Sequence, residues 1–374
     1  MEASSRSATS SWSGTARNGL THSTDADPGI RRRRRGRGFG YVDDRGDRVT
    51  DQETLERIRA LVIPPAWTDV WICADGSGHV QATGRDAKNR KQYLYHHGWR
   101  EYRDAAKFDD LAGFGEALVG LRKQVDADMG ASRLSLDRVA ATVVRLLDET
   151  LIRVGNEEYV RSGESYGLTT LRNRHAAVTG AEVRVRFQGK SGKPHDVVLH
   201  DRRVANIVRR CKDLPGQQLL RYVAGDEVRS VGSDDVNEYL GRVTGAGYTA
   251  KTFRTWGASA IALGHLRGLE PADQAEHDAQ RVEAVRVAAE HLHNTPAVCR
   301  KSYVHPVILT DDRATLDELI VRSGADAVRS SRWMSSDERA LLKVLTGSTP
   351  LNGHRSQPHD TPRARAGRGL PMVG

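Results

Sequence analysis

The sequence predicts an α+β protein with a small β-rich N-terminal domain and a larger, mainly α-helical domain. Its 374 residues exceed the ~100 to 200 residues of a typical domain, so two packed domains are expected. Short apolar runs separated by turn residues fill the chain between Phe39 and Tyr102, whereas beyond Phe108 apolar residues recur every three or four positions. This change of period places the domain boundary near residue 105.

The β-rich domain is predicted over residues 31–105. Its framework is two pairs of short strands, each pair joined by a turn rich in Asp and Gly. A short helix at 55–61 ends before the Pro64-Pro65 dipeptide, because proline disfavours helical geometry in the residue before it. The expected strands are 40–42, 48–50, 70–73 and 79–83.

The helical domain is predicted over residues 106–346. One hairpin interrupts it: apolar residues alternate with polar ones over 183–187, residues 189–192 form a turn, and 197–199 return. Ser335 and Glu338 have the spacing of a capping box for the last helix. The expected helices are 111–129, 136–151, 201–212, 233–244, 250–266, 276–293, 313–322 and 336–346.

Both ends of the chain lack apolar periodicity. Residues 1–30 are rich in Ser and Thr, and residues 347–374 are rich in Pro and Arg, so neither can bury enough apolar area to offset the entropy of ordering. We expect both to be disordered tails. The unbroken basic run at 31–35 has two interpretations, a solvated arm or an arm that grips phosphates.

Composition excludes several classes of protein. No apolar run approaches the ~18 residues of a membrane span, and the N-terminus lacks a secretory signal pattern. The three cysteines are odd in number and far apart, which excludes a disulfide framework and a CxxC-type zinc site. We therefore expect a cytoplasmic protein with reduced thiols, no membrane contact and no metal or other cofactor.

The net charge of +9 is concentrated in the tails, since residues 1–35 contribute +4 and residues 349–374 contribute +3. A polyanion site in the folded part must therefore be built by local clustering. Residues 84–97 combine four Lys or Arg with Gln92 and two tyrosines, and residues 172–212 hold eleven Lys or Arg against three acids. Each stretch is either a nucleic-acid surface or a solvated face over a core.

A set of short segments in fixed order carries a resemblance to a known family. These segments, with Lys190 in its hairpin turn, resemble the type IB DNA topoisomerases of the compact bacterial and poxviral kind, over roughly 31–335. The resemblance implies that the two domains form a C-shaped clamp around duplex DNA and that the enzyme is a monomer. The segments are 63–67, 84–97, 151–159, 165–175, 251–256 and 302–306.

The resemblance also implies catalytic positions. They fall on Arg153, Lys190, Arg254, Asn294 and Tyr303, with Asn294 standing where the family commonly has His. The implied chemistry is attack by a tyrosine phenol on a backbone phosphodiester, which gives a 3′-phosphotyrosyl enzyme and a free 5′-hydroxyl. Two guanidiniums can bind the nonbridging oxygens, and a lysine can protonate the leaving oxygen. Lys193 lies in the same Gly-rich turn as Lys190 and is the alternative proton donor.

The same resemblance, together with the basic clusters, predicts the residues that contact DNA. They are Arg85, Lys88, Arg90, Lys91, Gln92, Tyr93, Tyr95, Tyr159, Arg172, Arg174, His175 and Lys251.

Two alternative functions remain at this point. A tyrosine recombinase uses the same chemistry, but recombinases usually carry an HxxR motif where this sequence has residues 251–254, KTFR, and they lack the N-terminal segments. A noncatalytic DNA-binding protein would bind duplex with strong salt dependence and form no covalent adduct.

Overall fold

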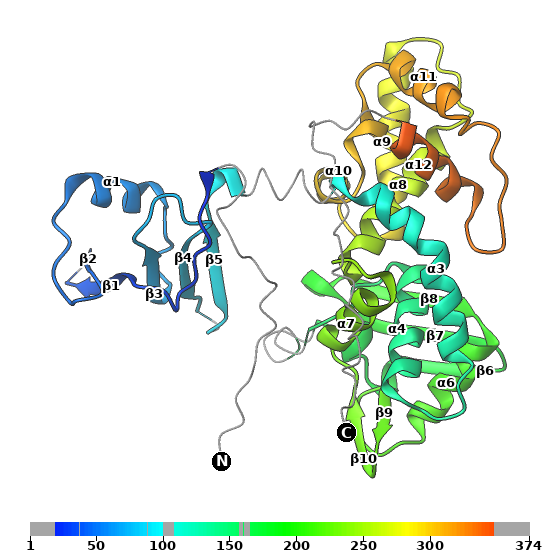
Figure 1. Ribbon diagram of the computed structural model, residues 1–374, viewed down its shortest axis with the longest axis horizontal. Helices are drawn as coiled ribbons and strands as arrows, with labels where there is room; N and C mark the ends of the chain where they lie inside the picture. Colours follow the sequence, from blue (N-terminus) through cyan, green and yellow to red (C-terminus); the bar gives the residue numbers. More distant parts are fainter. Residues whose placement is uncertain are drawn as a thin grey trace, which may run out of the picture.

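The computed structural model describes residues 19–36, 38–87, 89–99, 108–156, 160 and 165–347. It is an α+β structure in which an N-terminal antiparallel sheet is followed by a mainly helical region with two smaller sheets (Figure 1). The predicted tail at 348–374, Lys88 and Tyr159 lie outside the described residues.

The N-terminal sheet has five strands in the order β2-β1-β3-β4-β5. Helix α1 (Gln52–Ala60) lies between β2 and β3 in the chain, and Asp51 caps it by accepting a hydrogen bond from the Thr54 amide. The strands are β1 (Gly29–Arg35), β2 (Gly38–Val42), β3 (Thr68–Cys73), β4 (Val80–Arg85) and β5 (Lys91–Tyr95).

The prediction that residues 1–30 are disordered is wrong for 19–30. Leu20 and Ile30 are 6% and 5% exposed, and the Ser23 hydroxyl exchanges hydrogen bonds of 3.0 Å with the backbone of Val80. The basic run is likewise no flexible arm, because β1 pairs with both β2 and β3. Composition misled the prediction because strand pairing, rather than local apolar content, orders this segment.

Alternation of side chains along the strands gives the sheet two buried faces. Ile30, Val70 and Ile72 pack on one face with Ile58 of α1. Trp71 and Cys73, which alternate with them along β3, pack on the other face. The continuous apolar run at 70–73 is therefore explained by burial of both faces of β3.

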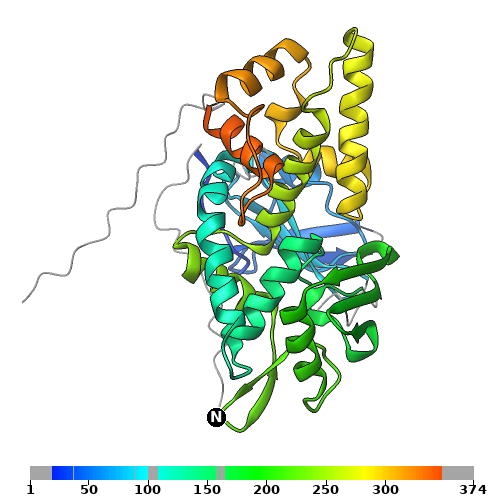
Figure 2. The same cartoon turned by 90° about the vertical axis from the view of Figure 1, so that its right-hand side faces the viewer.

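The helical region encloses one large core. The long helices α3 (Leu111–Met129) and α4 (Leu136–Thr150) pack on each other, and Figures 1 and 2 show α9, α11 and α12 at one end of this region and the β9–β10 hairpin at the other. The other α-helices of this region are α6 (Arg202–Lys212), α7 (Ser233–Thr244), α8 (Ala250–Leu266), α9 (Gln274–His291), α10 (Pro296–Ser302), α11 (Arg313–Ser323) and α12 (Ser336–Gly347). Every predicted helix is confirmed, within a few residues at its ends.

The predicted single hairpin proves to be part of a larger set of strands. Strands β7 (Glu182–Gln188) and β8 (Pro194–His200) form the predicted hairpin, and β6 (Ala176–Thr179) adds a third strand to it. A second hairpin pairs β9 (Arg221–Ala224) with β10 (Glu227–Ser230). The missed strands have only four residues each, which is too short for an alternating pattern to stand out.

A buried ion network fastens α12 onto α3 and α4. The Arg122 guanidinium donates to Asp148 at 2.8 Å and to Glu338 at 2.6 Å. Glu338 also forms the predicted capping box, because its backbone N–H donates to the Ser335 hydroxyl at 3.2 Å and its carboxylate accepts from the Ser335 N–H at 2.9 Å. Arg122 thus serves as a structural arginine whose charge is fully compensated.

Within the described part of the chain, no helix is long and apolar enough to cross a membrane. The three cysteines are buried free thiols.

Candidate active site

Arg254 lies on α8 in the middle of the core, with only 3% of its surface exposed. Its guanidinium donates to two backbone carbonyls, those of Leu151 and, at 3.0 Å, Leu292. Among the described residues it forms no ion pair with a carboxylate, and its buried Nε finds no acceptor. A buried charge without a carboxylate partner is costly, and this environment suits a guanidinium that binds an anion.

Arg122 shows what the same side chain looks like in a structural role. Hydrogen bonds to Asp148 and Glu338 outweigh the effect of burial and raise the pKa of Arg122. Burial, followed by the nearby charge of Arg153, instead lowers the pKa of Arg254. Two buried arginines in one core therefore differ in whether the protein supplies the counter-charge.

Arg153 follows α4 on a turn that is shaped by close backbone packing. Leu151 ends α4 in the left-handed conformation, with φ 52°. Its side chain packs directly on Gly257 of α8, where a Cβ atom would lie only 2.7 Å from it. The Arg153 carbonyl accepts from the Leu168 N–H at 3.0 Å. These contacts fix the backbone of Arg153 next to α8.

Asn294 completes the cluster from the turn after α9. The Arg153 Nη2 donates to its Oδ1 at 2.5 Å, and because Arg can only donate, this bond fixes which way the amide points. The Asn294 Nδ2 is buried and has no acceptor among the described residues. This buried donor is therefore available to an acceptor such as a phosphate oxygen. We call Arg153, Arg254 and Asn294 the arginine cluster.

Tyr303 stands against this cluster at the end of α10. Its ring centroid is 5.0 Å from the Arg254 guanidinium carbon, and the side chain is 9% exposed. Helix α10 holds it through the bond from the Tyr303 N–H to the Cys299 carbonyl at 2.9 Å, and the Ser259 hydroxyl of α8 donates to the Tyr303 carbonyl at 3.2 Å. Sequence periodicity did not predict α10, whose seven residues are too few for it.

Neighbouring charges prepare the Tyr303 phenol for ionisation. Burial by itself raises the pKa of Tyr303, but the positive charge of Arg254 opposes this effect. Arg153 and Lys251 add charge of the same sign, and the pKa of Tyr303 ends below its usual value. A lowered pKa favours the ionised form of the phenol, which is the form that acts as a nucleophile.

The predicted lysines occupy a tight turn between β7 and β8. Lys190 begins a short 3₁₀ segment, Lys190–Gly192, and Lys193 ends it. The Gly189 N–H donates to the Lys193 carbonyl at 2.8 Å, which closes the turn. The charge of Lys193 acts on His195 and His293, so the turn lies near the arginine cluster. We call residues 189–193 the lysine turn.

Two buried, uncompensated donors and an activated phenol suit attack on a phosphodiester. Residues 96–319 match the family described as eukaryotic DNA topoisomerase I, catalytic core, and residues 38–86 match the family described as bacterial DNA topoisomerase IB, N-terminal domain. The chain belongs to the type IB DNA topoisomerases. Both domains predicted from the sequence therefore have counterparts in that family.

Similar proteins carry the same name. The DNA topoisomerase 1B of Acanthamoeba polyphaga mimivirus is 31% identical over 273 residues, which are 71% of this chain and 81% of the viral protein. The DNA topoisomerase 1B of Vaccinia virus (strain Copenhagen) is 26% identical over 156 residues, which are 40% of this chain and 49% of that protein. The DNA topoisomerase 1 of Rabbit fibroma virus (strain Kasza) is 22% identical over 268 residues, 68% of this chain and 81% of its own.

In the N-terminal domain of this topoisomerase, carboxylates hold most of the side chains predicted to contact DNA. Asp86 accepts from Arg90 at 2.8 Å and from Gln92 at 3.0 Å, and Lys91 pairs with Asp25 at 2.7 Å. Arg85 donates to the Asn89 carbonyl at 3.1 Å and lies 3.9 Å from Asp69. These acids were not part of the predicted surface, and they orient the cations and Gln92 before any ligand is bound.

Tyr93 and Tyr95 project from the same face of β5, as predicted. Their ring centroids are 6.0 Å apart with 14° between the planes, and Tyr93 is 43% exposed. Tyr95 packs on Trp71 and its neighbours, so it belongs partly to the core. Tyr93 is therefore the better placed of the two to contact a ligand.

The predicted contacts in the helical region gather around one ring, that of Tyr166. His175 meets it edge-on at 4.4 Å, the Arg172 guanidinium lies 5.8 Å from its centroid, and Arg174 donates to its hydroxyl at 3.3 Å. The sequence did not single out Tyr166 as the organising residue. Lys251 stands apart from this group, exposed at the start of α8, where its charge reaches Tyr303.

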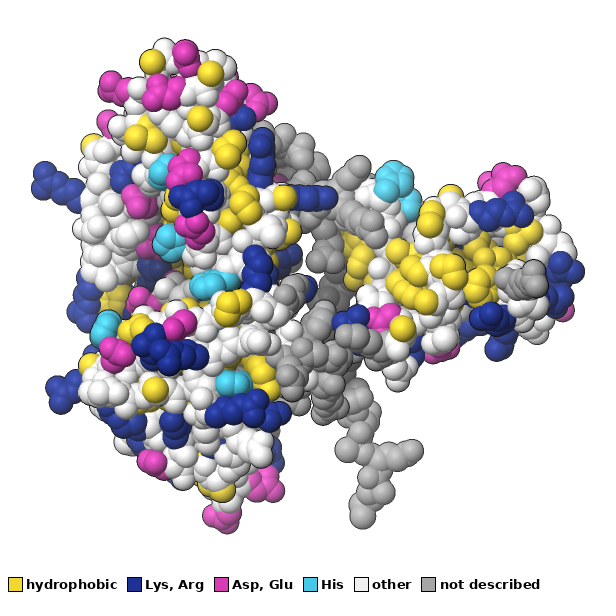
Figure 3. All heavy atoms as spheres, turned by 180° about the vertical axis from the view of Figure 1, so that it is seen from behind, with side chains coloured by type: hydrophobic (Ala, Val, Ile, Leu, Met, Phe, Trp, Pro, Cys, Tyr) yellow, Lys and Arg dark blue, Asp and Glu magenta, His cyan; other side chains and the backbone are white. Residues whose placement is uncertain are grey.

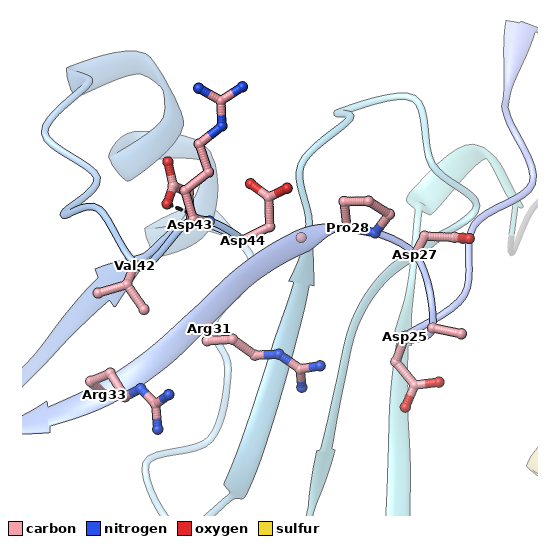
Figure 4. Close-up of a pocket in the computed structure, with 12 residues that line it drawn as sticks. Asp25, Asp27, Pro28, Arg31, Arg33, Val42, Asp43 and Asp44 are labelled. Atoms are coloured by element: carbon pink, nitrogen blue, oxygen red, sulfur yellow. Dashed lines mark hydrogen bonds between the residues drawn. The ribbon is translucent and has the colours of Figure 1, made fainter.

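The basic strand β1 divides into structural and exposed arginines. Arg32 donates to the backbone carbonyls of Ile63, Pro64 and Trp67, at 3.4, 3.1 and 2.6 Å, and thereby holds the predicted 63–67 segment. A hollow of about 490 Å³ beside β1 is lined by Arg31 and Arg33 and by four aspartates, Asp25, Asp27, Asp43 and Asp44 (Figure 4). The hollow therefore mixes both charges, and its lining includes none of the residues around Tyr303.

Charge is unevenly spread over the helical region. Figure 3 shows acidic side chains gathered at the end that α11 occupies, with Lys and Arg more frequent toward the β6–β8 sheet. On β7, Arg184 and Arg186 share Asp196 at 2.6 and 3.1 Å, while Val183 and Phe187 face the core. The predicted construction of a basic face over an apolar face is confirmed.

Proposed function

We propose that this topoisomerase relaxes supercoiled duplex DNA by cutting and resealing one strand. The Tyr303 phenol loses its proton to solvent, its Oη attacks the phosphorus and forms a P–O bond, and the P–O bond to the 5′-oxygen breaks. The product is a 3′-phosphotyrosyl enzyme with a free 5′-hydroxyl. Because the new ester retains the energy of the old one, the cut strand can rotate and the 5′-hydroxyl can reverse the reaction without ATP.

The arginine cluster stabilises the charge that develops on the nonbridging oxygens. Arg254 and Arg153 present guanidinium forks, which match two phosphate oxygens better than a point charge does. The orphaned Asn294 Nδ2 supplies a neutral donor to the same group. Asn294 cannot titrate, so its role is to bind the oxygen and not to transfer a proton.

Lys190 protonates the leaving 5′-oxygen as general acid and removes that proton during resealing. The exposed Tyr93 and the Tyr166 group contact the duplex, and the two domains close on it as a clamp. The enzyme works as a monomer without a metal ion. Neutralising phosphates through these cations makes binding strongly dependent on salt.

The single observation that carries this proposal is the juxtaposition of the uncompensated Arg254 with the Tyr303 phenol, 5.0 Å from guanidinium carbon to ring centroid. Plasmid relaxation in EDTA without ATP tests it, with Tyr303→Phe as the matched variant. We expect the wild type to relax the plasmid and Tyr303→Phe to bind DNA without relaxing it. A requirement for Mg²⁺ or ATP would refute the mechanism. Binding by the wild type with no denaturant-stable adduct would indicate a noncatalytic protein.

A further inference from the structure

A stack of three rings runs beside the active site, and the proposed chemistry does not use it. His195 of β8 lies opposite Phe187 of β7, with centroids 4.6 Å apart and 10° between the planes. His293, from the turn after α9, stacks on His195 with centroids 4.1 Å apart and 21° between the planes. His195 is 5% exposed, so the middle ring of the stack is enclosed.

One side of the stack is in direct contact with the lysine turn. A Cβ placed on Gly189 would lie 2.5 Å from the His195 Nε2, so the imidazole touches the backbone at the residue before Lys190. The backbone of Gly189 has φ −88°, which any residue can adopt. Contact with His195, and not backbone conformation, therefore makes glycine necessary at position 189.

The other side of the stack belongs to the turn that holds the arginine cluster. His293 lies between Leu292, whose carbonyl accepts from Arg254 at 3.0 Å, and Asn294, whose Oδ1 accepts from Arg153 at 2.5 Å. The stacked ring therefore belongs to the same three-residue stretch as both acceptors. His293 also adopts φ 50°, in the left-handed region, where His, Asn and Asp are more frequent than other non-glycine residues.

Both rings are suited to packing and not to proton transfer. Burial first, then the charges of His293 and Arg153 among others, lowers the pKa of His195 to about 4. Burial and the charge of Arg254 also lower the pKa of His293. The Nδ1 of His195 is buried without a hydrogen-bond partner in the described part of the chain. Neutral stacked rings join two segments without adding charge near the phosphate.

We propose that His195 and His293 are positioning residues that join the lysine turn to the arginine cluster, so that the lysine and Tyr303 act on one phosphodiester. This inference rests on the proposed function, because it assumes that a lysine of the turn protonates the leaving 5′-oxygen. Misplacement of a catalytic group by about 1 Å can cost ~100-fold in rate. Loss of the stack would therefore impair the proton donor specifically.

The test measures single-turnover cleavage by His195→Ala and His293→Asn on ordinary DNA and on DNA whose bridging 5′-oxygen is replaced by sulfur. Sulfur leaves without protonation, so it removes the need for the acid. His293→Asn removes the ring and retains a residue that tolerates φ 50°. His200→Ala, an exposed position on the same strand, is the matched control.

We expect each stack variant to cleave ordinary DNA at least ~10-fold more slowly than the wild type and to recover most of that loss on the sulfur substrate. Adding His195→Ala to Lys190→Ala should slow cleavage no further, since both changes remove the same contribution. His200→Ala should behave as the wild type. Thermal melting shows which variants fold, and the half-buried ring of His293 makes His293→Asn the less disruptive change.

Two outcomes would overturn the positioning role alone. In the first, both stack variants cleave ordinary DNA at the wild-type rate. In the second, the sulfur substrate restores cleavage by Lys190→Ala or Lys193→Ala but does not restore cleavage by the stack variants. If sulfur restores neither lysine variant, the assignment of the acid in the proposed function is wrong, and the inference fails with it.

Discussion

Replacing Arg254 and Arg122 by alanine, one at a time, should separate catalysis from stability. Arg254 contributes an uncompensated charge beside Tyr303, so Arg254→Ala should slow single-turnover cleavage by ~10² to 10³, or about 3 to 4 kcal/mol of transition-state stabilisation. Arg122→Ala should leave the cleavage rate of the folded enzyme unchanged. It leaves the half-buried Asp148 and Glu338 without their cation, which costs up to about 3 to 5 kcal/mol of unfolding free energy.

The assays are rapid-quench cleavage of a labelled duplex and thermal unfolding of the same preparations. For a domain of this size the Arg122 variant should melt about 10 °C lower, whereas Arg254→Ala should change little in melting temperature. Arg254→Lys should recover little activity, because an ammonium cannot reproduce the fork. The pH profile of cleavage by Arg254→Ala should move to higher pH, since that charge lowers the pKa of Tyr303. Normal cleavage by Arg254→Ala with weaker DNA binding would reduce Arg254 to a phosphate anchor.

Three further predictions use matched residues. Lys190→Ala should slow cleavage of ordinary DNA and recover on the sulfur substrate, whereas Lys193→Ala should do neither; recovery by the Lys193 variant alone would move the acid there. Neutralising the exposed arginines at 33–35 should reduce the salt dependence of DNA binding and leave the cleavage rate at saturating enzyme unchanged. Arg32→Ala should instead lower the melting temperature. If the salt dependence of binding does not change, residues 33–35 do not contact phosphates. His305 is buried and has a pKa of about 4, so between pH 6.5 and 4 it binds a proton only on unfolding. The free energy of unfolding should therefore fall by up to about 3 kcal/mol from pH 6.5 to 4, and His305→Asn should make that fall smaller. The same dependence of unfolding free energy on pH in both proteins would contradict this prediction.

Long elements were predictable from the sequence because their patterns repeat. Helices α3 and α4 carry an apolar residue at nearly every third or fourth position, and the structure buries those residues. Strand β1 was not predictable in the same way, since five arginines give no alternating pattern and its order comes from pairing with β2 and β3. Deleting residues 1–35 to remove a basic arm would remove a strand from inside the sheet.

The order of short segments was enough to propose catalytic residues, but the contacts of those residues were not predictable. Arg153 and Asn294 are 141 residues apart in sequence, and nothing local indicates their bond. The partners of Arg90 and Lys91 were also hidden, because Asp86 and Asp25 look like ordinary turn residues. His195 and His293 carry no motif, and only the fold shows that their rings stack.

The covalent intermediate is the most direct test of the central claim. The wild-type enzyme is trapped on a duplex whose cut strand loses its short 5′-hydroxyl fragment, and the adduct is digested and sequenced by mass spectrometry. We expect the nucleotide on Tyr303, linked through the 3′-phosphate, with a 5′-hydroxyl on the released fragment and no adduct from Tyr303→Phe. A 5′-phosphate linkage, attachment to another residue, or an adduct formed by Tyr303→Phe would contradict the account.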